Sequence, residues 1–493
     1  MNNAFKLVAA VIVVASSTAA AADPAQAPLD RSRRVPPSAA RPFVAPSVRE
    51  SQLVNGVKLA VAEIKRLPIV SVDIILPYAG AAHDPQGKAG LAGLVSDLVM
   101  EGAGGMNGQQ LAEALADKGI SLGVSVDDDL MKISIFATKE TLDDAMGLAA
   151  EIVRSPALPQ PAFDRLKQET LAGVEQKRGN PGALAGERLA GRIYGSNPYG
   201  AVPSESSVQS LELGDARAFA ASNLRPEGAV IAAAGDVSLT DFEALAAKHF
   251  GDWRAQAGAP VPAATPAVAA QAAAPGLLID VIDMPGSQQS AIRAGGQSIK
   301  RTDPDYYSVA LMNFLLGRAP ILNRLERNLR EQHRWAYGAR LTPEYKLQGG
   351  GYVISADVQT DATVPALQEI LKELRRLQTE RVGDDELAST KRLMNGMFAM
   401  GIQTVQAVAG SVAANEAKGL PADELARYQA GISAVTADQL QAAANKYIKP
   451  DQLQVVISGD AARIAAGLAA VGQVRVYDVE GKLEQAGAKG AGR

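Results

Sequence analysis

The chain has 493 residues, which is room for several domains at ~100–200 residues each, and 47% hydrophobic with 21% charged residues is typical of a globular protein with a large core. The formal net charge of −4 and the aromatic content of 4% argue against a nucleic-acid-binding surface and against stacking platforms for bases. The sequence contains no cysteine, so disulfide bonds and thiolate metal sites are excluded.

The N-terminus has the pattern of a secretory signal peptide. Lys6 supplies a positive charge, Leu7–Ala15 is a continuous apolar run, and the small residues Ala19–Ala22 precede Asp23. The apolar run is shorter than the ~20 residues that a permanent membrane-spanning helix needs. We therefore expect residues 1–22 to be a signal peptide and no membrane span after its removal. The expected location is beyond the inner membrane, in the bacterial periplasm.

Residues 23–45 are rich in Pro, Ala and Arg and are expected to form a disordered or extended leader. A first half then spans residues 46–254, with Asn55-Gly56 predicting a tight turn between strands. The alternating and helical apolar patterns predict strands at 52–61, 70–77, 121–126, 131–137 and 229–235, and helices at 91–99, 109–118, 139–154, 161–177, 210–223 and 239–250.

An Ala/Pro-rich stretch at residues 255–276 is predicted to be a linker. The second half spans 277–480 and is followed by a tail at 481–493. Thr436 is a plausible N-cap of its last predicted helix. The predicted strands lie at 277–281, 289–295, 337–341, 352–358 and 453–459, and the helices at 306–316, 321–332, 363–378, 384–400 and 436–447.

The two halves end in the same way. Residues 223–236 and 446–460 each run from a helix through a strand to Gly-Asp. An internal duplication is the economical explanation. Strands and helices do not alternate strictly, so the predicted fold class is α+β, with two homologous halves that are each an α/β sandwich: a mixed sheet with helices on one face.

Several short motifs, in their order and spacing, resemble the pitrilysin, insulin-degrading and mitochondrial processing peptidase family. The resemblance covers about residues 46–475. In the first half the matching segments are Leu53–Val57, Pro68–Gly80, Gly90-Leu91-Ala92, Asn197–Gly200 and Gly235-Asp236; in the second half they are Arg324–Glu331, Trp335–Tyr337, and Asp385–Leu387 with Lys391. The resemblance implies a clamshell of the two halves around a peptide.

The family binds its catalytic zinc through an inverted H-x-x-E-H helix, in which two His bind the metal and the Glu polarises the attacking water. In this sequence the two His positions are Gly93 and Asp97, and the base position is Ser96. Matching the later helix puts Gly173 at the position of the third ligand. All four functional positions are replaced, so we expect no zinc or other cofactor in this chain.

A zinc site elsewhere in the chain is disfavoured by its histidines. The three His residues, His83, His249 and His333, lie in separate segments, and none is at helical pairing distance from another. A site assembled across segments remains conceivable but is the less favoured interpretation.

The second half carries Arg330 and Tyr337 with six residues between them, as in active members of the family. The resemblance implies that this pair binds the substrate carbonyl and stabilises the developing oxyanion, since a guanidinium and a phenol can both donate to it. The alternative is that Arg330 belongs to a solvated basic face with Arg324, Arg327 and Arg334, and that Tyr337 is an ordinary core or edge tyrosine.

A chain with the Arg/Tyr pair and without the metal site suggests that the pair acts in the active site of another chain. In the family, some peptidases consist of two chains, of which one carries the zinc motif. The resemblance therefore implies a non-catalytic subunit of a heterodimeric zinc peptidase, whose partner is a homologous subunit that holds the zinc and whose substrate is a peptide. The alternatives are a stand-alone peptide-binding or scaffolding protein and, as the least favoured, an independent peptidase with an unusual metal site.

Overall fold

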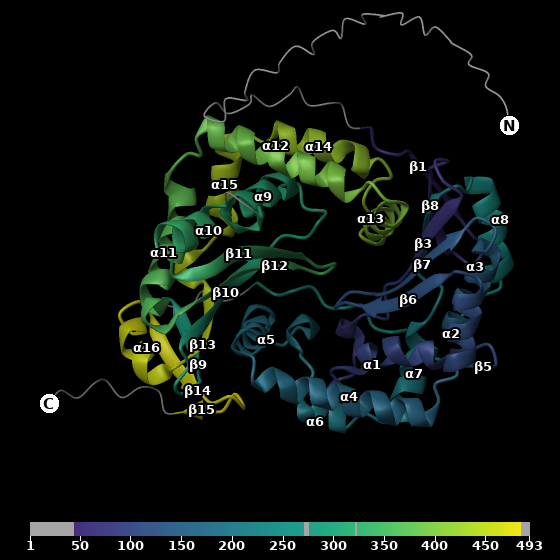
Figure 1. The fold of residues 1–493 in the computed structure, drawn as a ribbon, viewed down its shortest axis with the longest axis horizontal. Coiled ribbons are helices and arrows are strands. Elements are labelled where there is room, and N and C mark those ends of the chain that lie inside the picture. The colour runs from purple at the N-terminus through teal and green to yellow at the C-terminus, as the bar shows by residue number, and fades with distance from the viewer. Residues whose placement is uncertain (1–43, 271–275, 321–322, 485–493) are drawn as a thin grey trace, which may run out of the picture. The chain divides into compact units, whose positions relative to one another are not determined.

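A computed structural model describes residues 44–270, 276–320 and 323–484 (Figure 1). The predicted signal peptide at 1–22, nearly all of the predicted leader at 23–45 and most of the predicted tail lie outside the described residues. Among the described residues no single helix is long and apolar enough to cross a membrane, although the bent pair α12 (Asp384–Gly401) and α13 (Val405–Ala417) passes the same test of length and composition together.

The first part of the described chain builds a six-stranded mixed sheet with the order β1-β2-β8-β3-β7-β6. The pair β2 and β8 is parallel, and the other neighbours are antiparallel. The strands are β1 (Val48–Gln52), β2 (Lys58–Glu63), β3 (Ile69–Leu76), β6 (Ser121–Val126), β7 (Met131–Thr138) and β8 (Val230–Gly235), and a separate short ribbon joins β4 (Gly102–Ala103) to β5 (Met106–Asn107).

The second part builds a seven-stranded sheet with the order β11-β12-β10-β13-β9-β14-β15. Here β9 is parallel to both β13 and β14, and the other neighbours are antiparallel. The strands are β9 (Leu278–Asp283), β10 (Gln289–Ser298), β11 (Ala336–Tyr345), β12 (Gly350–Gln359), β13 (Gln454–Gly459), β14 (Gln473–Tyr477) and β15 (Leu483–Glu484).

The two sheets repeat one topology. The run β2-β8-β3-β7-β6 of the first sheet corresponds in order and direction to β9-β13-β10-β12-β11 of the second. In both sheets a strand that comes late in its half, β8 or β13, follows a long helical segment and lies between two strands that precede it in the chain. The α+β class and the two sheet-plus-helix halves predicted from the sequence are confirmed.

Each sheet buries one face against helices of its own half, and two large apolar cores result. Alternation along the strands provides these faces: Val70, Val72 and Ile74 of β3 all point into the first core and are fully buried.

The helices of the first half are α1 (Leu91–Leu98), α2 (Gly108–Asp117), α3 (Leu142–Arg154), α4 (Gln160–Arg178), α5 (Pro181–Tyr194), α6 (Glu205–Gln209), α7 (Leu213–Asn223) and α8 (Leu239–Phe250).

The helices of the second half include two short π-helical segments, Phe314–Arg318 and Arg327–Gln332. The second of these continues α10, so the helix predicted at 321–332 changes its hydrogen-bond pattern partway along. The α-helices are α9 (Tyr306–Asn313), α10 (Arg324–Glu326), α11 (Thr363–Thr379), α12, α13, α14 (Glu424–Ala434), α15 (Ala437–Tyr447) and α16 (Ala461–Leu468).

The opposite face of each sheet is covered by a helix from the other half (Figure 1). Helix α13 lies on β2, β3 and β8, where Val408 and Val412 pack against Ala232 and Ala234. Helix α5 lies on β10 and β13. Neither helix was among those predicted from the sequence. The exchange ties the two halves together because each half completes the burial of the other half's sheet.

The segment predicted as a linker has no helix or strand in its described part, residues 255–270. It lies along the protein and is held by hydrogen bonds from Val268 N to Gln348 O (3.0 Å) and from Asn197 Nδ2 to Pro266 O (2.9 Å). The described part of this segment is therefore attached to a residue of each half, Asn197 and Gln348.

Candidate functional site

Helix α1, which carries three of the four family positions, is fixed at its N-terminus by the partly buried carboxylate of Asp84. The Asp84 oxygens accept hydrogen bonds from Gly90 N (2.8 Å) and Ala92 N (2.7 Å). Burial raises the pKa of Asp84 to about 6, and these amide donors oppose the rise by stabilising its charged form. The apolar face of α1, including Leu91 and Leu94, lies in the first core.

The four replaced positions are divided between α1 and α4, two helices that contact each other. Gly93, Ser96 and Asp97 are on α1 and Gly173 is on α4. The Ser96 hydroxyl is turned back onto its own helix and donates to Gly93 O at 2.7 Å. A Cβ atom added at Gly93 or Gly173 would meet no other heavy atom within 4 Å, so packing does not require glycine at either position.

A cluster of ionised side chains that the sequence analysis did not single out surrounds Asp97. Arg165 of α4 donates to Glu101 (2.6 Å) and to Glu169 (2.8 Å). Burial, followed by the charge of Glu169, raises the pKa of Asp97, whereas Arg165 lowers it. The positive charge of Arg165 thus partly offsets the negative charges of Asp97, Glu101 and Glu169. The spacing of Arg165 and Glu169, one helical turn apart, is the signal in the sequence that could have indicated it.

These residues do not fit a zinc ion. The imidazoles and the general base are absent, and Asp97 is the only metal-ligating side chain among the four positions. Across the described residues, no group of three or more His, Cys, Asp or Glu side chains is arranged to hold a metal ion. We therefore derive no catalytic step through a metal in this chain.

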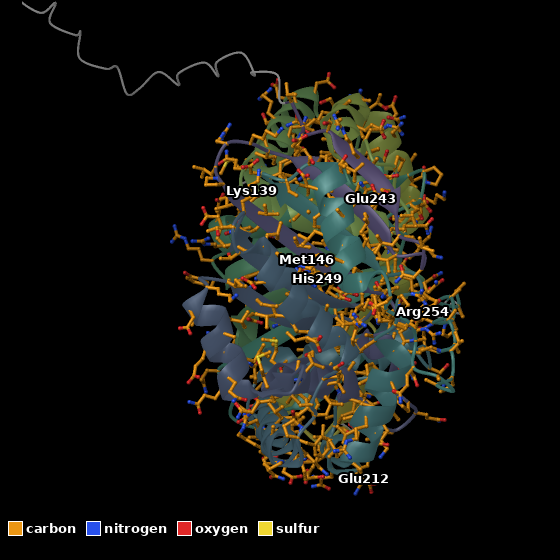
Figure 2. The ribbon with its side chains drawn as sticks, turned by 90° about the vertical axis from the view of Figure 1, so that its right-hand side faces the viewer. Lys139, Met146, Glu212, Glu243, His249 and Arg254 are labelled. Carbon is orange, nitrogen blue, oxygen red and sulfur yellow. The ribbon has the colours of Figure 1, made fainter. Side chains whose placement is uncertain are left out.

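The three histidines have separate surroundings. His83 lies edge-on to the ring of Tyr78 with 5.7 Å between centroids. His249 is 2.7 Å from Asp143, where α8 packs on α3 (Figure 2). His333 stacks on Trp335 with 4.1 Å between centroids. The structure therefore brings no two of them into one site.

Arg330 and Tyr337 lie next to one another in the second half. Arg330 belongs to the π-helical segment and Tyr337 to the start of β11, and the guanidinium carbon is 5.5 Å from the centroid of the phenol ring. The Arg330 side chain is 51% exposed and pairs with Glu326 at 2.5 Å, and Tyr337 is 91% exposed. A tyrosine this exposed contributes nothing to the core, so Tyr337 is not a core residue. It lies on β11, the edge strand of the second sheet, which fits the alternative interpretation of an edge-strand tyrosine.

Two arginines near this pair in the sequence, Arg324 and Arg334, have settings of their own. Arg324 is 6% exposed and makes two hydrogen bonds to Glu386, at 3.0 and 2.7 Å. Arg334 has a positive φ of 59°, which is uncommon for a residue with a side chain. Arg324 is therefore a buried structural residue, and the interpretation of one continuous solvated basic face is wrong at that position.

Models of two protein families match this chain. The model described as "Insulinase (Peptidase family M16)" matches residues 67–202, and the model described as "Peptidase M16 inactive domain" matches residues 210–394. The paired mixed sheets define the fold of a peptidase. Helix α1 has Gly93, Ser96 and Asp97 at the motif positions, so the chain lacks the catalytic residues of that class. The chain belongs to the M16 peptidase family, also called the pitrilysin family.

The relatives of this chain include proteins named as inactive. The "Non-peptidase homolog YmxG" of Helicobacter pylori is 26% identical over 192 residues, which is 38% of this chain and 44% of the relative, so less than half of that relative's length is matched. The crystal structure of the "peptidase M16 inactive domain" from Pseudomonas fluorescens is 27% identical with a TM-score of 0.77, covering 84% of this chain and 97% of that one.

Two more distant solved structures share the fold. A protease from Helicobacter pylori has a TM-score of 0.77 at 20% identity, covering 84% of this chain and all of that one. The periplasmic protease PqqL from Escherichia coli has a TM-score of 0.72 at 14% identity, covering 85% of this chain and 46% of that one. These two structures support the peptidase fold alone, and the two relatives named as inactive support a non-catalytic protein with that fold.

Proposed function

We propose that this chain is the non-catalytic subunit of a heterodimeric zinc peptidase and that it supplies Arg330 and Tyr337 to the active site of a zinc-bearing partner. One observation carries the proposal: an exposed, adjacent Arg/Tyr pair is present in a chain whose α1 has neither the metal ligands nor the general base of the family. Such a pair has a chemical use only where another polypeptide activates the water.

The exposure and the setting of the pair support this role. Tyr337 is 91% exposed, so its hydroxyl is free to donate to a group on another molecule. Arg330 lies in a π-helical segment, a departure from the α-helix that recurs at functional sites. The segment between the two residues contains the stacked rings of His333 and Trp335 and the positive φ of Arg334.

In the proposed complex the guanidinium of Arg330 and the hydroxyl of Tyr337 donate hydrogen bonds to the carbonyl oxygen of a bound peptide. The negative charge on that oxygen grows as water adds to the carbonyl carbon, so the two donors stabilise the transition state more than the ground state. Removing one donor of this kind typically lowers kcat by ~10²–10³-fold.

We also propose that the protein is exported and acts in the periplasm on peptides. The signal-peptide pattern of residues 1–22 and the periplasmic location in the name of PqqL, a neighbour in fold, support this. Fractionation of the native host, with detection of the protein in the periplasmic extract or in the cytoplasm, tests the location.

The functional test needs the partner, which is identified as a homologous chain with an intact H-x-x-E-H encoded beside this one. We expect the purified chain to bind no stoichiometric zinc by mass spectrometry and to cleave no fluorogenic peptide, and activity to appear when the partner is added. Arg330→Ala and Tyr337→Phe should lower kcat while size-exclusion chromatography still shows the complex. Arg392→Ala, which changes an exposed arginine on α12, is the matched control.

Three results separate the proposal from its alternatives. Unchanged kcat in both variants would show that the pair has no role in the reaction. Peptide cleavage by the isolated chain that a chelator abolishes would identify an independent peptidase. Peptide binding by the isolated chain, with no partner and no gain of activity, would favour the stand-alone peptide-binding protein.

A further inference from the structure

A groove with a cavity volume of about 780 Å³ lies on the first half, and none of Gly93, Ser96, Asp97, Gly173, Arg330 and Tyr337 lines it. Three segments form it: the end of α3 with the residues up to Leu158, the side of α7 from Arg217 to Leu224, and residues 252–256 beyond α8. Its volume is within the range of ligand clefts, ~300–1,000 Å³. Figure 2 shows Arg254, one of its residues, on the face that carries α3 and α8. We call it the arginine groove.

The floor of the arginine groove is apolar and rigid. Val153, Leu158 and Trp253 are each at most 4% exposed and belong to the first core. Trp253 is held from behind, because Asn55 Nδ2 donates to the carbonyls of Trp253 (3.1 Å) and Phe250 (2.7 Å). A fixed apolar floor favours binding because little side-chain entropy is lost when a ligand covers it.

The rim of the groove is positively charged. Arg154, Arg217 and Arg254 line it together with a single acidic residue, Asp252. Arg154 already pairs with Asp252 at 2.9 Å, and Arg254 donates to the backbone carbonyls of Gly251 and Trp253. Within the described part of the chain, no group accepts a hydrogen bond from the Arg217 side chain. Two guanidinium charges of the rim therefore have no acidic partner there.

Leu158 adds a sign of strain in the floor. Its φ of 45° is in the left-handed region, which is unfavourable for a bulky residue and unusual before a proline, here Pro159. The conformation is held by the neighbouring backbone, where Ala157 N donates to Gly102 O at 2.8 Å. Backbone strain of this kind concentrates at binding and functional sites because elsewhere it is only a cost.

We propose that the arginine groove docks an acidic linear segment of a partner polypeptide. Carboxylates of that segment pair with Arg217 and Arg254, and an apolar side chain between them packs on the floor around Trp253. The interaction is separate from Arg330 and Tyr337 and does not depend on the function proposed above.

The chain's own terminal segments are unsuited to this groove by charge. Residues 485–493 contain Lys489 and Arg493 and no acidic residue. Residues 23–43 contain two aspartates, Asp23 and Asp30, against four arginines. Both segments are basic, so they would be repelled from the rim, and the occupant we infer is another polypeptide.

Calorimetric titration of the full mature chain with a designed probe peptide, acetyl-SELEES-amide, tests the proposal without any partner subunit. We expect saturable binding that weakens with added salt, because the rim contacts are ionic. The uncharged counterpart acetyl-SQLQQS-amide should bind at least about tenfold more weakly, and so should the acidic peptide to Arg217→Gln with Arg254→Gln. The control is Arg463→Gln, an exposed arginine on α16, which should leave binding unchanged.

Fluorescence places the peptide in the groove. The chain has two tryptophans, so Trp335→Phe leaves Trp253 as the only one, and its emission should change on titration with the acidic peptide. Equal binding of both peptides, unchanged binding by the Arg217/Arg254 variant, or no binding up to ~1 mM would overturn the proposal. Self-association that the same two substitutions abolish would overturn it too, because the occupant would then be a second copy of this chain.

Discussion

The buried carboxylate of Asp280 offers the sharpest test of how the two halves are joined. Asp280 lies on β9, is 1% exposed and accepts a hydrogen bond from Arg188 Nε of the exchanged helix α5 at 2.8 Å. It also accepts two from Arg475 of β14, at 2.7 and 2.9 Å. The carboxylate thus fixes a helix of the first half to the sheet of the second.

Asp280→Asn keeps the size of the side chain and removes its charge. Breaking a buried ion pair by changing one partner typically costs ~3–5 kcal/mol. We expect about 3 kcal/mol, the lower end, because Arg188 and Arg475 are 22% and 27% exposed and water partly screens them. Against a net stability of ~5–15 kcal/mol, this loss is a large fraction.

Urea unfolding followed by circular dichroism measures the change in free energy. Asp361→Asn is the matched control, since Asp361 also pairs with an arginine but is 87% exposed, and it should cost at most ~0.5 kcal/mol. A double-mutant cycle of Asp280→Asn with Arg188→Gln should give a coupling energy of ~1–3 kcal/mol. If Asp280→Asn cost no more than the control, the carboxylate would not join the halves and the reasoning would be refuted.

Further predictions concern single positions. The pKa of Asp84 is raised to about 6, so the contribution of this group to stability is present below about pH 4 and is lost as the pH rises through 6. Between these pH values the difference in unfolding free energy between the wild type and Asp84→Asn should fall by up to ~1.4 kcal/mol per pH unit. A difference that stays constant with pH would contradict this prediction. Gly410→Leu should destabilise the protein by ~1–3 kcal/mol in thermal unfolding, because a Cβ at this position would be 3.3 Å from Asp73 Oδ2. Gly396→Ala should instead stabilise the protein by ~0.5–1 kcal/mol, because this glycine of α12 has open space around it. Thr436→Ala should cost ~1 kcal/mol in urea unfolding, because the hydroxyl caps α15, and no loss would show that water replaces the cap.

The sequence predicted the elements whose pattern is visible within one segment. The turn at Asn55-Gly56 joins β1 to β2 as expected, and the side chain of Thr436 accepts from Gln439 N as the N-cap of α15. The predicted strands at 121–126 and 131–137 match β6 and β7 to within a residue. These succeed because alternation, helical spacing and cap chemistry are local properties of the chain.

The residues of the candidate site could be predicted from the sequence, but the burial and the distant partners of their neighbours could be predicted only in part. The replaced positions on α1 and the pair Arg330 and Tyr337 follow from spacing and family resemblance. The burial of Arg324 against Glu386 does not, because an arginine in a run of arginines gives no local sign that a distant carboxylate will cover it. Arg165 was missed although its spacing to Glu169 was a usable local sign; its contact with Glu101, 64 residues earlier, had none.

The sequence by itself determined the α+β class, the duplicated halves and the loss of the catalytic residues, since each of these is encoded in local pattern or in residue identity. Only the tertiary structure decided that α5 and α13 exchange between the halves. Helix α5 contains three glycines, which lower its helix propensity, and α13 consists largely of small residues without a polar face, so α13 lacks the pattern of a surface helix. The small side chains of α13 pack against the alanine-rich face of the first sheet, and α5 packs against the second sheet, and both sheets are formed by strands far away in the sequence. The cap at Asn180, followed by Pro181, was the one local sign of α5.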